Sequence, residues 1–315
     1  MDRAIHQEFF TLNNGNKIPG VAIIGTGTKW FKKVESEETF SKELVEQIKY
    51  ALTLPGIVHI DAAEIYRTYP EIGAAIEESR RKPRNQIWIT DKYSTSLKIT
   101  ENPKVGLETS LKKMGVEYVD LYLLHSPFVT EEKNGFSLEQ AWKYLEELYK
   151  NGKAKNIGVS NFGVKDLERI LKVAEIKPQV NQIEYSAFLQ NQTPGIYKFA
   201  REHDILLEAY SPLGPLTIEH SEDDEFYRYI KELSHKYDKT EAQILLRWVA
   251  DRHVLPVTTS GKKERIEEAQ YLYSFDLTYD ESNNITQLGL QHKPLRKYWT
   301  EQYSKYDADS QKSDD

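Results

Sequence analysis

Eight short apolar segments recur along the chain, and each is followed by a stretch with helical spacing of apolar residues. The segments are rich in Val, Ile and Leu and show little alternation of apolar and polar positions, which is typical of strands buried on both faces of a parallel sheet. The repeated strand–helix order also favours a parallel sheet. The predicted strands cover residues 21–25, 57–61, 87–91, 119–125, 157–160, 180–182, 205–210 and 254–258.

The clearest predicted helix lies between Ser137 and Asn151. Gln140 follows Ser137 at the spacing of a capping box, and Asn151-Gly152 is a typical stop signal. The apolar residues between these signals recur at intervals of three and four, so they share one helical face. They are Leu138, Ala141, Trp142, Leu145 and Leu148.

Eight strand–helix units in one chain of 315 residues favour a closed (β/α)8 TIM barrel. The alternative is an open, doubly wound sheet with a glycine-rich fingerprint after its first strand. The chain has glycines there only at Gly25 and Gly27, without the third glycine of the fingerprint. We therefore predict the barrel. A β-hairpin over residues 9–18, turning at Asn14-Gly15, is expected to cover its floor.

Composition limits the class of protein. Hydrophobic residues make up 39% of the chain and no Pro-, Gly- or Ser-rich stretch divides it, which indicates one domain. We expect a barrel over residues 9–305, an N-terminal tail at 1–8 and a disordered polar tail at 306–315. A net charge of −7 spread along the chain argues against a nucleic-acid partner. No apolar run approaches the roughly 20 residues that span a bilayer, so we expect no membrane partner.

The chain contains no cysteine, which excludes disulfides, thiolate metal sites and thiol nucleophiles. This composition fits a reducing compartment, and the N-terminal segment lacks the hydrophobic core of a secretion signal. We therefore expect a cytoplasmic protein, working as a monomer or weak dimer.

The segment from His59 to Tyr66 carries the most specific chemical signal. A predicted strand ends in Asp61, and Tyr66 follows five residues later, so a carboxylate and a phenol share one mouth of the barrel. Lys92 lies just past the third predicted strand, and His125 closes the fourth. Because the carboxyl ends of barrel strands meet on one face, we expect the four side chains to converge there. His59 itself is interpreted as a buried core histidine.

These four residues can deliver a proton. A free tyrosine has a pKa near 10, and a general acid works best when its pKa is closer to the working pH. We expect the Lys92 ammonium to lower the pKa of Tyr66, and Asp61 to hold Lys92. His125 can donate a hydrogen bond to a substrate carbonyl oxygen. A metal-dependent hydrolase is less favoured because no His-x-His pair stands at any predicted strand end, so we expect no metal.

Six motifs along the chain resemble those of the aldo-keto reductase family, in the same order. They are LNNGNKIP from Leu12, HIDAAEIY from His59, LYLLHSP from Leu121, IGVSNF from Ile157, VNQIE from Val180 and AYSPLG from Ala209. Within the family, the chain is most similar to fungal reductases of α-keto amides and conjugated polyketones. The resemblance implies that Asp61, Tyr66, Lys92 and His125 form a catalytic tetrad in which Tyr66 is the proton donor.

The resemblance also implies a nicotinamide cofactor, NADPH, across the barrel mouth. Ser160, Asn161 and Gln182 match positions that hold the carboxamide, and Tyr210 matches the ring that stacks on the nicotinamide. The remaining matched cofactor positions are Ser211 and Leu213 at the pyrophosphate, with Gly25, Thr26 and Gln190 as weaker matches.

One departure from the family lies around the adenosine 2′-phosphate. The family often has Lys-Ser with an Arg five positions after the Ser, whereas this chain has Thr259, Ser260 and Arg265. Arg265 can still bind a phosphate through two donors, and Lys262 or Lys263 can replace the missing cation, so we expect NADPH rather than NADH. A second departure is Ala269, where an asparagine commonly contacts the adenine.

The expected function is NADPH-dependent reduction of aldehydes or ketones, such as α-keto amides, α-keto esters, keto lactones or other α-dicarbonyls. Trp30, Phe128, Tyr298 and Trp299 are candidates for an aromatic wall of the substrate pocket, the last two in a C-terminal loop. The alternative to an enzyme is a regulatory or sensor protein that binds NADP(H) on the same barrel with little turnover.

Overall fold

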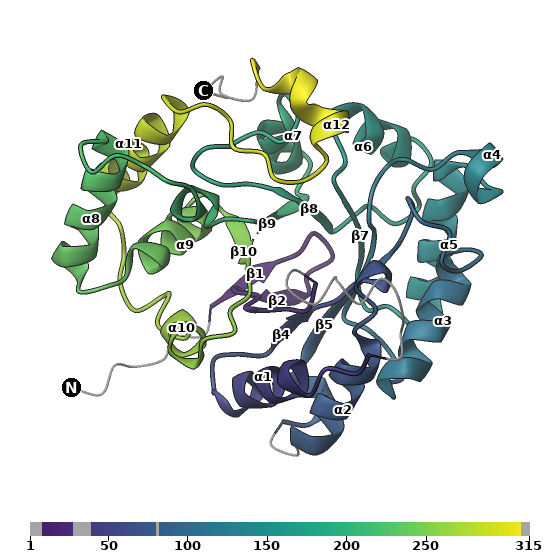
Figure 1. Cartoon of the computed structure of the whole chain (residues 1–315). Helices are drawn as coiled ribbons and strands as arrows, with labels where there is room; N and C mark the ends of the chain where they lie inside the picture. Colours follow the sequence, from purple (N-terminus) through teal and green to yellow (C-terminus); the bar gives the residue numbers. More distant parts are fainter. Residues whose placement is uncertain (1–7, 28–38, 80–81, 310–315) are drawn as a thin grey trace.

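The computed structural model describes residues 8–27, 39–79 and 82–309, and its centre is an eight-stranded parallel sheet (Figure 1). Neighbouring strands follow one another in the order β10-β9-β8-β7-β6-β5-β4-β3. The strands are β3 (Ile24–Gly25), β4 (His59–Asp61), β5 (Trp88–Tyr93), β6 (Leu121–Leu124), β7 (Ile157–Ser160), β8 (Val180–Glu184), β9 (Leu206–Tyr210) and β10 (Val254–Val257).

The first and last strands of this sheet also meet. A parallel bridge joins Ala22 to Val257. The Ala22 N–H donates to the Pro256 carbonyl at 3.0 Å, and the Thr258 N–H donates to the Ala22 carbonyl at 2.7 Å. Closure pairs both edges of the sheet and confirms the predicted (β/α)8 barrel.

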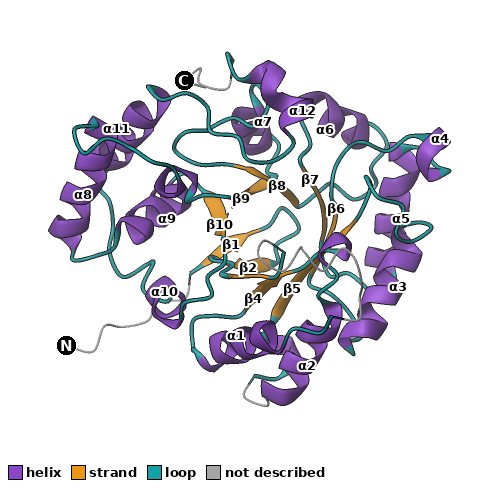
Figure 2. Ribbon diagram, viewed as in Figure 1, coloured by secondary structure: helices purple, strands orange, loops and turns teal. Residues whose placement is uncertain are grey.

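A ring of helices surrounds the strands (Figure 2). Helix α8 is an addition to the regular alternation, inserted between β9 and α9, and it packs against α11. The helices are α1 (Lys42–Thr53), α2 (Tyr69–Ser79), α3 (Pro103–Met114), α4 (Glu131–Asn134), α5 (Leu138–Lys150), α6 (Val164–Leu171), α7 (Ile196–Glu202), α8 (Glu225–Tyr237), α9 (Glu241–Asp251), α10 (Lys263–Ala269), α11 (Tyr279–Leu290) and α12 (Thr300–Tyr303).

Helix α5 shows how closely local signals set an element. Ser137 caps it by accepting the Gln140 N–H at 3.1 Å, and the helix ends at Lys150 with Asn151 as its C-cap, at the predicted stop signal. Gly152 follows with φ +71°, a conformation that glycine adopts without strain. The predicted apolar face is buried.

Strand β5 is longer than predicted. Its parallel pairing with β6 continues through Lys92 and Tyr93. Lys92 therefore lies inside the strand, and its placement just past the strand is wrong. The polar run Asp91-Lys92 suggested a strand end, but the pairing with β6 continues past it to Tyr93.

The N-terminal hairpin lies across the barrel floor. Strands β1 (Phe9–Thr11) and β2 (Lys17–Pro19) pair antiparallel around a turn that contains Gly15 at φ +86°. Asn14 and Asn16 both donate from Nδ2 to Asn156 Oδ1, at 2.8 and 2.9 Å, just before β7 begins. The predicted hairpin and its position are confirmed.

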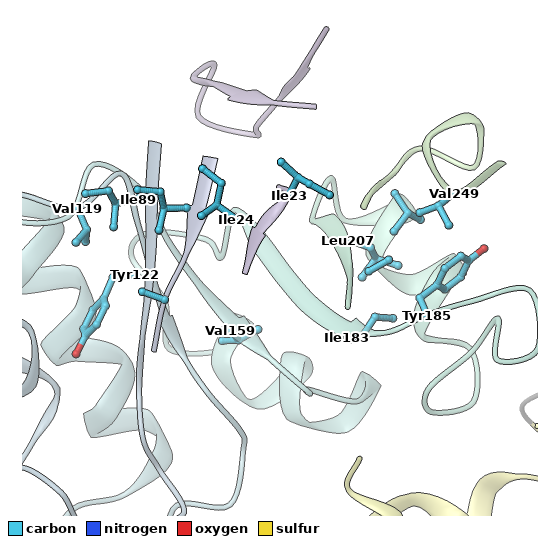
Figure 3. Close-up of a cluster of buried hydrophobic side chains, with 14 of the residues drawn as sticks. Ile23, Ile24, Ile89, Val119, Tyr122, Val159, Ile183, Tyr185, Leu207 and Val249 are labelled. Carbon is cyan, nitrogen blue, oxygen red and sulfur yellow. The ribbon is translucent and has the colours of Figure 1, made fainter. Parts of the chain in front are cut away.

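The two largest apolar clusters among the described residues lie inside and around the barrel. One fills the barrel interior above the hairpin and includes Ile18, Leu123, Val180 and Leu255. The larger one lies between the strands and the surrounding helices (Figure 3). Figure 3 labels part of it: Ile23, Ile24, Ile89, Val119, Tyr122, Val159, Ile183, Tyr185, Leu207 and Val249.

The end of the described chain contacts the barrel mouth. The polar tail was expected to begin at residue 306, but Tyr306 closes a short turn, η5 (Ser304–Tyr306), and the Asp307 carboxylate pairs with Arg296 at 2.9 Å. Residues 310–315 lie outside the described part. Among the described helices, none combines the length and apolar character needed to cross a membrane.

Candidate active site

The predicted catalytic side chains come from three neighbouring strand ends and one turn. Asp61 is the last residue of β4, Lys92 lies near the end of β5, and His125 follows β6 directly. Tyr66 closes η2 (Glu64–Tyr66), the turn that follows β4. All four therefore stand at the carboxyl ends of the strands, as the sequence predicts.

Lys92 binds both of its predicted partners. Its Nζ lies 2.8 Å from Asp61 Oδ2 and donates to Tyr66 Oη at 3.4 Å and to the Ala62 carbonyl at 2.9 Å. The Lys92 and Asp61 side chains are 0% and 5% exposed, so water does not screen the pair. The three bonds account for the three donors of the ammonium.

The protonation states follow from burial and from these contacts. Burial lowers the pKa of Lys92, but Asp61 and then Tyr66 outweigh it, so the pKa lies above its ordinary value and the amine stays charged. Burial raises the pKa of Tyr66; Lys92 opposes this effect and Asp61 adds to it. The expected net lowering of the Tyr66 pKa is therefore wrong, because burial outweighs the ammonium. Tyr66 is held as a neutral phenol.

His125 borders the phenol. The two rings meet edge to face, with centroids 5.9 Å apart and planes at 82°. Burial lowers the pKa of His125 well below its ordinary value, and Lys92 lowers it further, so the imidazole is neutral. A neutral imidazole can donate one hydrogen bond to a substrate oxygen.

Two residues that were not predicted as functional hold Tyr66 in place. Gly27 lies against its ring, since a Cβ there would be 2.7 Å from two ring carbons. Glu64, in the same turn as Tyr66, accepts the Ser94 N–H at 2.9 Å and the Thr100 hydroxyl at 2.6 Å, which ties the turn to the loop after β5. The sequence analysis considered Gly27 only as a fingerprint glycine and Glu64 only as part of the HIDAAEIY motif.

A second polar group lies at the ends of β7, β8 and β9. Ser160 donates to the Gln182 carbonyl at 2.8 Å. Asn161, at φ +63°, donates from Nδ2 to the His125 carbonyl at 2.9 Å. Its Oδ1 accepts the Tyr210 hydroxyl at 2.7 Å and Gln192 Nε2 at 2.9 Å. The sequence prediction brought Ser160, Asn161, Gln182 and Tyr210 together and missed Gln192, whose buried Oε1 finds no hydrogen-bond partner within the described residues.

Gln182 connects this group to the catalytic residues. Its Nε2 donates to Asp61 Oδ1 at 2.9 Å and to Glu208 Oε2 at 2.7 Å. Glu208 is fully buried, and burial raises its pKa to about 8 despite the bond from Gln182. Glu208 was not predicted, although a carboxylate inside an otherwise apolar strand is a signal that the sequence contains.

The residues that match the family's cofactor positions more weakly contact other parts of the protein. Thr26 is fully buried, and its N–H and hydroxyl both donate to the Asp61 carbonyl, at 3.0 and 3.1 Å. Gly25 closes the barrel, since a Cβ there would lie 3.1 Å from the Thr258 carbonyl oxygen. Gln190 donates to the Ala187 and Thr286 carbonyls.

The predicted phosphate residues follow β9 and β10. Ser211, at φ +54°, starts a tight turn together with Leu213. Thr259 accepts a long, 3.5 Å hydrogen bond from Gln47 on α1, and Ser260 accepts the Lys262 N–H. The other predicted residues of this region are Arg265, Lys262 and Lys263, exposed around the start of α10, and Ala269, buried at its end.

Three of the four aromatic candidates gather near the mouth. Phe128 contacts Trp299, with ring centroids 5.4 Å apart, and Tyr303 at 5.9 Å. Tyr298 meets Tyr210 edge to face at 5.7 Å and remains 46% exposed. The fourth candidate, Trp30, lies outside the described residues.

Metal ligation finds no geometric support in the part of the chain that the structure describes, where no three His, Asp or Glu side chains gather in a way that could hold an ion. His59 is fully buried and bonds Thr90 Oγ1 at 2.8 Å, which agrees with its interpretation as a core histidine.

Comparisons with known proteins bear on this geometry. Residues 23–289 match the family described as "Aldo/keto reductase family". The chain is 67% identical to the NADPH-dependent alpha-keto amide reductase of Saccharomyces cerevisiae, with 98% of this chain and 99% of that protein covered. It is 37% identical to the NAD/NADP-dependent indole-3-acetaldehyde reductase of Schizosaccharomyces pombe, with 88% and 94% covered. The crystal structure of a Bombyx mori aldo-keto reductase in complex with NADP superposes with a TM-score of 0.79 at 28% identity, covering 96% of this chain and all of that one.

Proposed function

Because this chain belongs to the aldo/keto reductase family of oxidoreductases, we propose that it is an NADPH-dependent reductase of small carbonyl substrates. The preferred substrates are α-keto amides, α-keto esters, keto lactones or other α-dicarbonyls. The 67% identical yeast relative, named as an NADPH-dependent alpha-keto amide reductase, supports both the cofactor and the substrate class. The observation that carries the proposal is the buried Lys92 ammonium bonded to both Asp61 and Tyr66.

The chain's own residues supply the proton. NADPH, when bound, supplies a hydride for the carbonyl carbon. Tyr66 donates its hydroxyl proton to the carbonyl oxygen, and Lys92 stabilises the phenolate that remains. Asp61 keeps Lys92 charged and oriented, and His125 donates a hydrogen bond that orients the same carbonyl oxygen. In this role the raised pKa of Tyr66 keeps its proton in place until the oxygen becomes basic.

The residues at the mouth fit a nicotinamide. Ser160, Asn161 and Gln182 offer uncharged donors and acceptors suited to a carboxamide, and Tyr210 offers an aromatic face. The buried Gln192 Oε1, which has no partner among the described residues, is the kind of acceptor that an amide N–H satisfies. Since the side-chain donors of Ser160, Asn161 and Gln182 are already bonded to protein groups, a contact with the cofactor through any of these donors requires an exchange of one of these bonds.

The phosphate end favours NADPH through exposed cations. Arg265, Lys262 and Lys263 are exposed, follow Ser260 within five residues of the chain and can meet a 2′-phosphate. Thr259 stands where the family often has a lysine, which leaves Arg265 as the main phosphate ligand. Ser211 and Leu213 form the turn assigned to the pyrophosphate, with Gly25 and Thr26 supporting the mouth from β3.

Phe128, Tyr298 and Trp299, with Trp30, are assigned to the wall of the substrate pocket. Their aromatic faces suit substrates with apolar substituents next to the dicarbonyl. The C-terminal position of two of them makes the loop after α11 the main source of selectivity.

The proposal is tested by the loss of NADPH absorbance with an α-keto amide as substrate. Tyr66→Phe removes the proton donor and keeps the ring, so kcat is expected to fall on the order of 10²- to 10⁴-fold with little change in NADPH affinity. Near-normal turnover in this variant contradicts the assignment of Tyr66. Tight NADPH binding without turnover in the unmodified protein supports the alternative, a regulatory or sensor protein.

The protein is further proposed to act as a monomer or weak dimer in the cytoplasm. The absence of cysteine fits a reducing compartment. Light scattering across a concentration series tests the oligomeric state, and cell fractionation tests the location.

A further inference from the structure

A buried carboxylate fastens the C-terminal segment to the barrel. Residues 295–303, here named the C-terminal strap, pass over the end of β8. Glu184, the last residue of β8, is 1% exposed, and its Oε1 accepts the Lys297 N–H at 2.8 Å. Its Oε2 accepts the next N–H, that of Tyr298, at 3.2 Å. One side chain thus binds two consecutive backbone amides of the strap.

The amides bound by Glu184 belong to the part of the strap that carries the aromatic wall. The Tyr298 ring meets the Tyr210 ring edge to face, with centroids 5.7 Å apart. Trp299 follows in the left-handed region, at φ +53°, and its ring contacts Phe128. Displacement of the backbone at residues 297–298 therefore moves both strap rings relative to the barrel.

The strap is also tied to the polar group at the mouth. The Tyr303 hydroxyl donates to the carbonyl of Asn161, which in turn bonds Tyr210 through its side chain. Two further bonds hold the start of the strap: the Leu295 N–H donates to the Phe188 carbonyl at 3.0 Å, and the Lys297 ammonium donates to the Thr217 hydroxyl. Among these groups, Glu184 is the one that binds the backbone N–H groups of both Lys297 and Tyr298.

We infer that Glu184 is a positioning residue that sets the selectivity for bulky substrates by holding the strap backbone at Lys297 and Tyr298. This inference rests on the proposed reductase function. Glu184 does not touch the reacting atoms in this scheme; it acts through the place of the aromatic wall. Small dicarbonyls do not reach the aromatic wall, so their kcat/KM does not depend on where the wall lies.

The ionised form of Glu184 is required for this role. A carboxylate presents two acceptors to two N–H groups, whereas a protonated carboxyl or an amide presents one acceptor and one donor. Burial raises the pKa of Glu184 to about 7, while the Lys297 and Tyr298 amides and the Arg296 and Lys297 cations oppose this effect. Tyr210 and Tyr298 are the other titratable groups that face it.

The chain offers a matched control in Glu146 on α5. Glu146 is 4% exposed and also accepts two consecutive amides, those of Glu175 and Ile176, at 2.7 and 2.9 Å, but both through one oxygen, Oε1. It also accepts the indole N–H of Trp142 at 3.1 Å. Helix α5 lies in the outer ring of helices, away from the strap (Figure 1). Glu146→Gln therefore removes a buried carboxylate that binds two consecutive amides, at a loop that does not face the mouth, while the amide oxygen of the glutamine can keep the bonds that Oε1 now accepts.

The experiment compares kcat/KM for an N-aryl α-keto amide with kcat/KM for 2,3-butanedione. Glu184→Gln is expected to change the ratio of these values by about tenfold, the effect of one lost hydrogen bond to a charged group, with the value for 2,3-butanedione within about twofold of wild type. Glu146→Gln is expected to leave the ratio unchanged. An unchanged ratio in Glu184→Gln, or an equal change in Glu146→Gln, overturns the inference.

A pH series on the wild-type protein tests the same inference without a variant. The ratio is expected to move toward the Glu184→Gln value as pH falls from 8 to 6, and to stay flat in the variant. Because both substrates use the same proton donor, titration of that donor cancels in the ratio. A flat wild-type ratio overturns the inference alone, whereas no NADPH oxidation with either substrate overturns the proposed function and the inference with it.

Discussion

The Glu208→Gln variant should be more stable than the wild-type protein, by a difference in the free energy of unfolding that grows as the pH rises. Glu208 is fully buried on β9, and its one hydrogen bond among the described residues comes from Gln182 Nε2 at 2.7 Å. Its Oε1 has no partner in this part of the chain. Burial raises its pKa from 4.5 to about 8, so the folded protein keeps a proton that the unfolded chain releases. Glu208→Gln keeps the acceptor for Gln182 and removes the titration.

The magnitude follows from the two pKa values. Stability contributed by the protonated carboxyl is fully present below pH 4.5 and is lost as pH rises toward 8. The loss is about 1.4 kcal/mol for each pH unit between these limits, or about 3 kcal/mol at pH 7. Glutamine carries no such loss. The N–H₂ group of the glutamine, like the O–H of the protonated carboxyl, lies where no hydrogen-bond partner is found among the described residues. The cost of burying an unpaired donor is therefore similar in the two proteins and largely cancels in their comparison.

The assay is chemical denaturation of both proteins between pH 5 and 8. The difference in the free energy of unfolding should grow in favour of Glu208→Gln by about 1.4 kcal/mol per pH unit. Glu281→Gln serves as a control, because the pKa of Glu281 is shifted in the opposite direction to that of Glu208. Burial raises the pKa of Glu281, but the Lys236 and Tyr237 side chains and Thr278 together outweigh burial and hold this pKa at about 2, so Glu281→Gln should destabilise the protein at pH 7. Parallel stability curves for wild type and Glu208→Gln would refute the reasoning.

Two further predictions concern the cofactor and the proton donor. Arg265→Ala should weaken NADPH binding by about 2 kcal/mol, roughly thirtyfold, and NADH binding far less, measured by fluorescence titration; equal losses would mean that Arg265 does not meet the 2′-phosphate. Gly27→Ala should lower kcat on the order of a hundredfold, since its Cβ would stand 2.7 Å from the Tyr66 ring. Gly261→Ala is the control, because its nearest neighbour would be Gln47 at 3.9 Å, and equal losses in both variants would exclude a ring-specific effect.

The order of elements could be predicted from the sequence because short continuous apolar runs mark the buried parallel strands, and apolar residues spaced by three and four mark the helices between them. Strand β7 has its predicted bounds, and α5 begins and ends at its predicted signals. The end of β5 could not be predicted, since Lys92 is polar and yet fully buried. Its burial depends on Asp61 and Tyr66, which lie about thirty residues earlier in the chain.

The sequence was sufficient to predict which residues form the candidate site, but not the pKa shifts of their side chains. Local patterns place Asp61, Tyr66, Lys92 and His125 at one mouth, and the structure brings them there. The net pKa shift of Tyr66 depends on how far the phenol is buried, which no local pattern gives. Glu184 and Glu208 were missed for a related reason, because their roles come from partners more than 100 residues away or on a neighbouring strand.

A single ammonium limits how many anions the site can hold. Lys92 is bonded to Asp61 and Tyr66, and Glu208 reaches it only through Gln182 and Asp61. When Tyr66 gives up its proton, the phenolate becomes the second anion near Lys92, and an ionised Glu208 would be a third. Like charges disfavour ionisation, so loss of the Glu208 proton should make Tyr66 a weaker proton donor. The rate of carbonyl reduction in the wild-type protein should therefore fall as pH rises through about 8, and Glu208→Gln should move this fall to higher pH. Coincident pH profiles of kcat for the two proteins would show that Glu208 does not influence proton transfer.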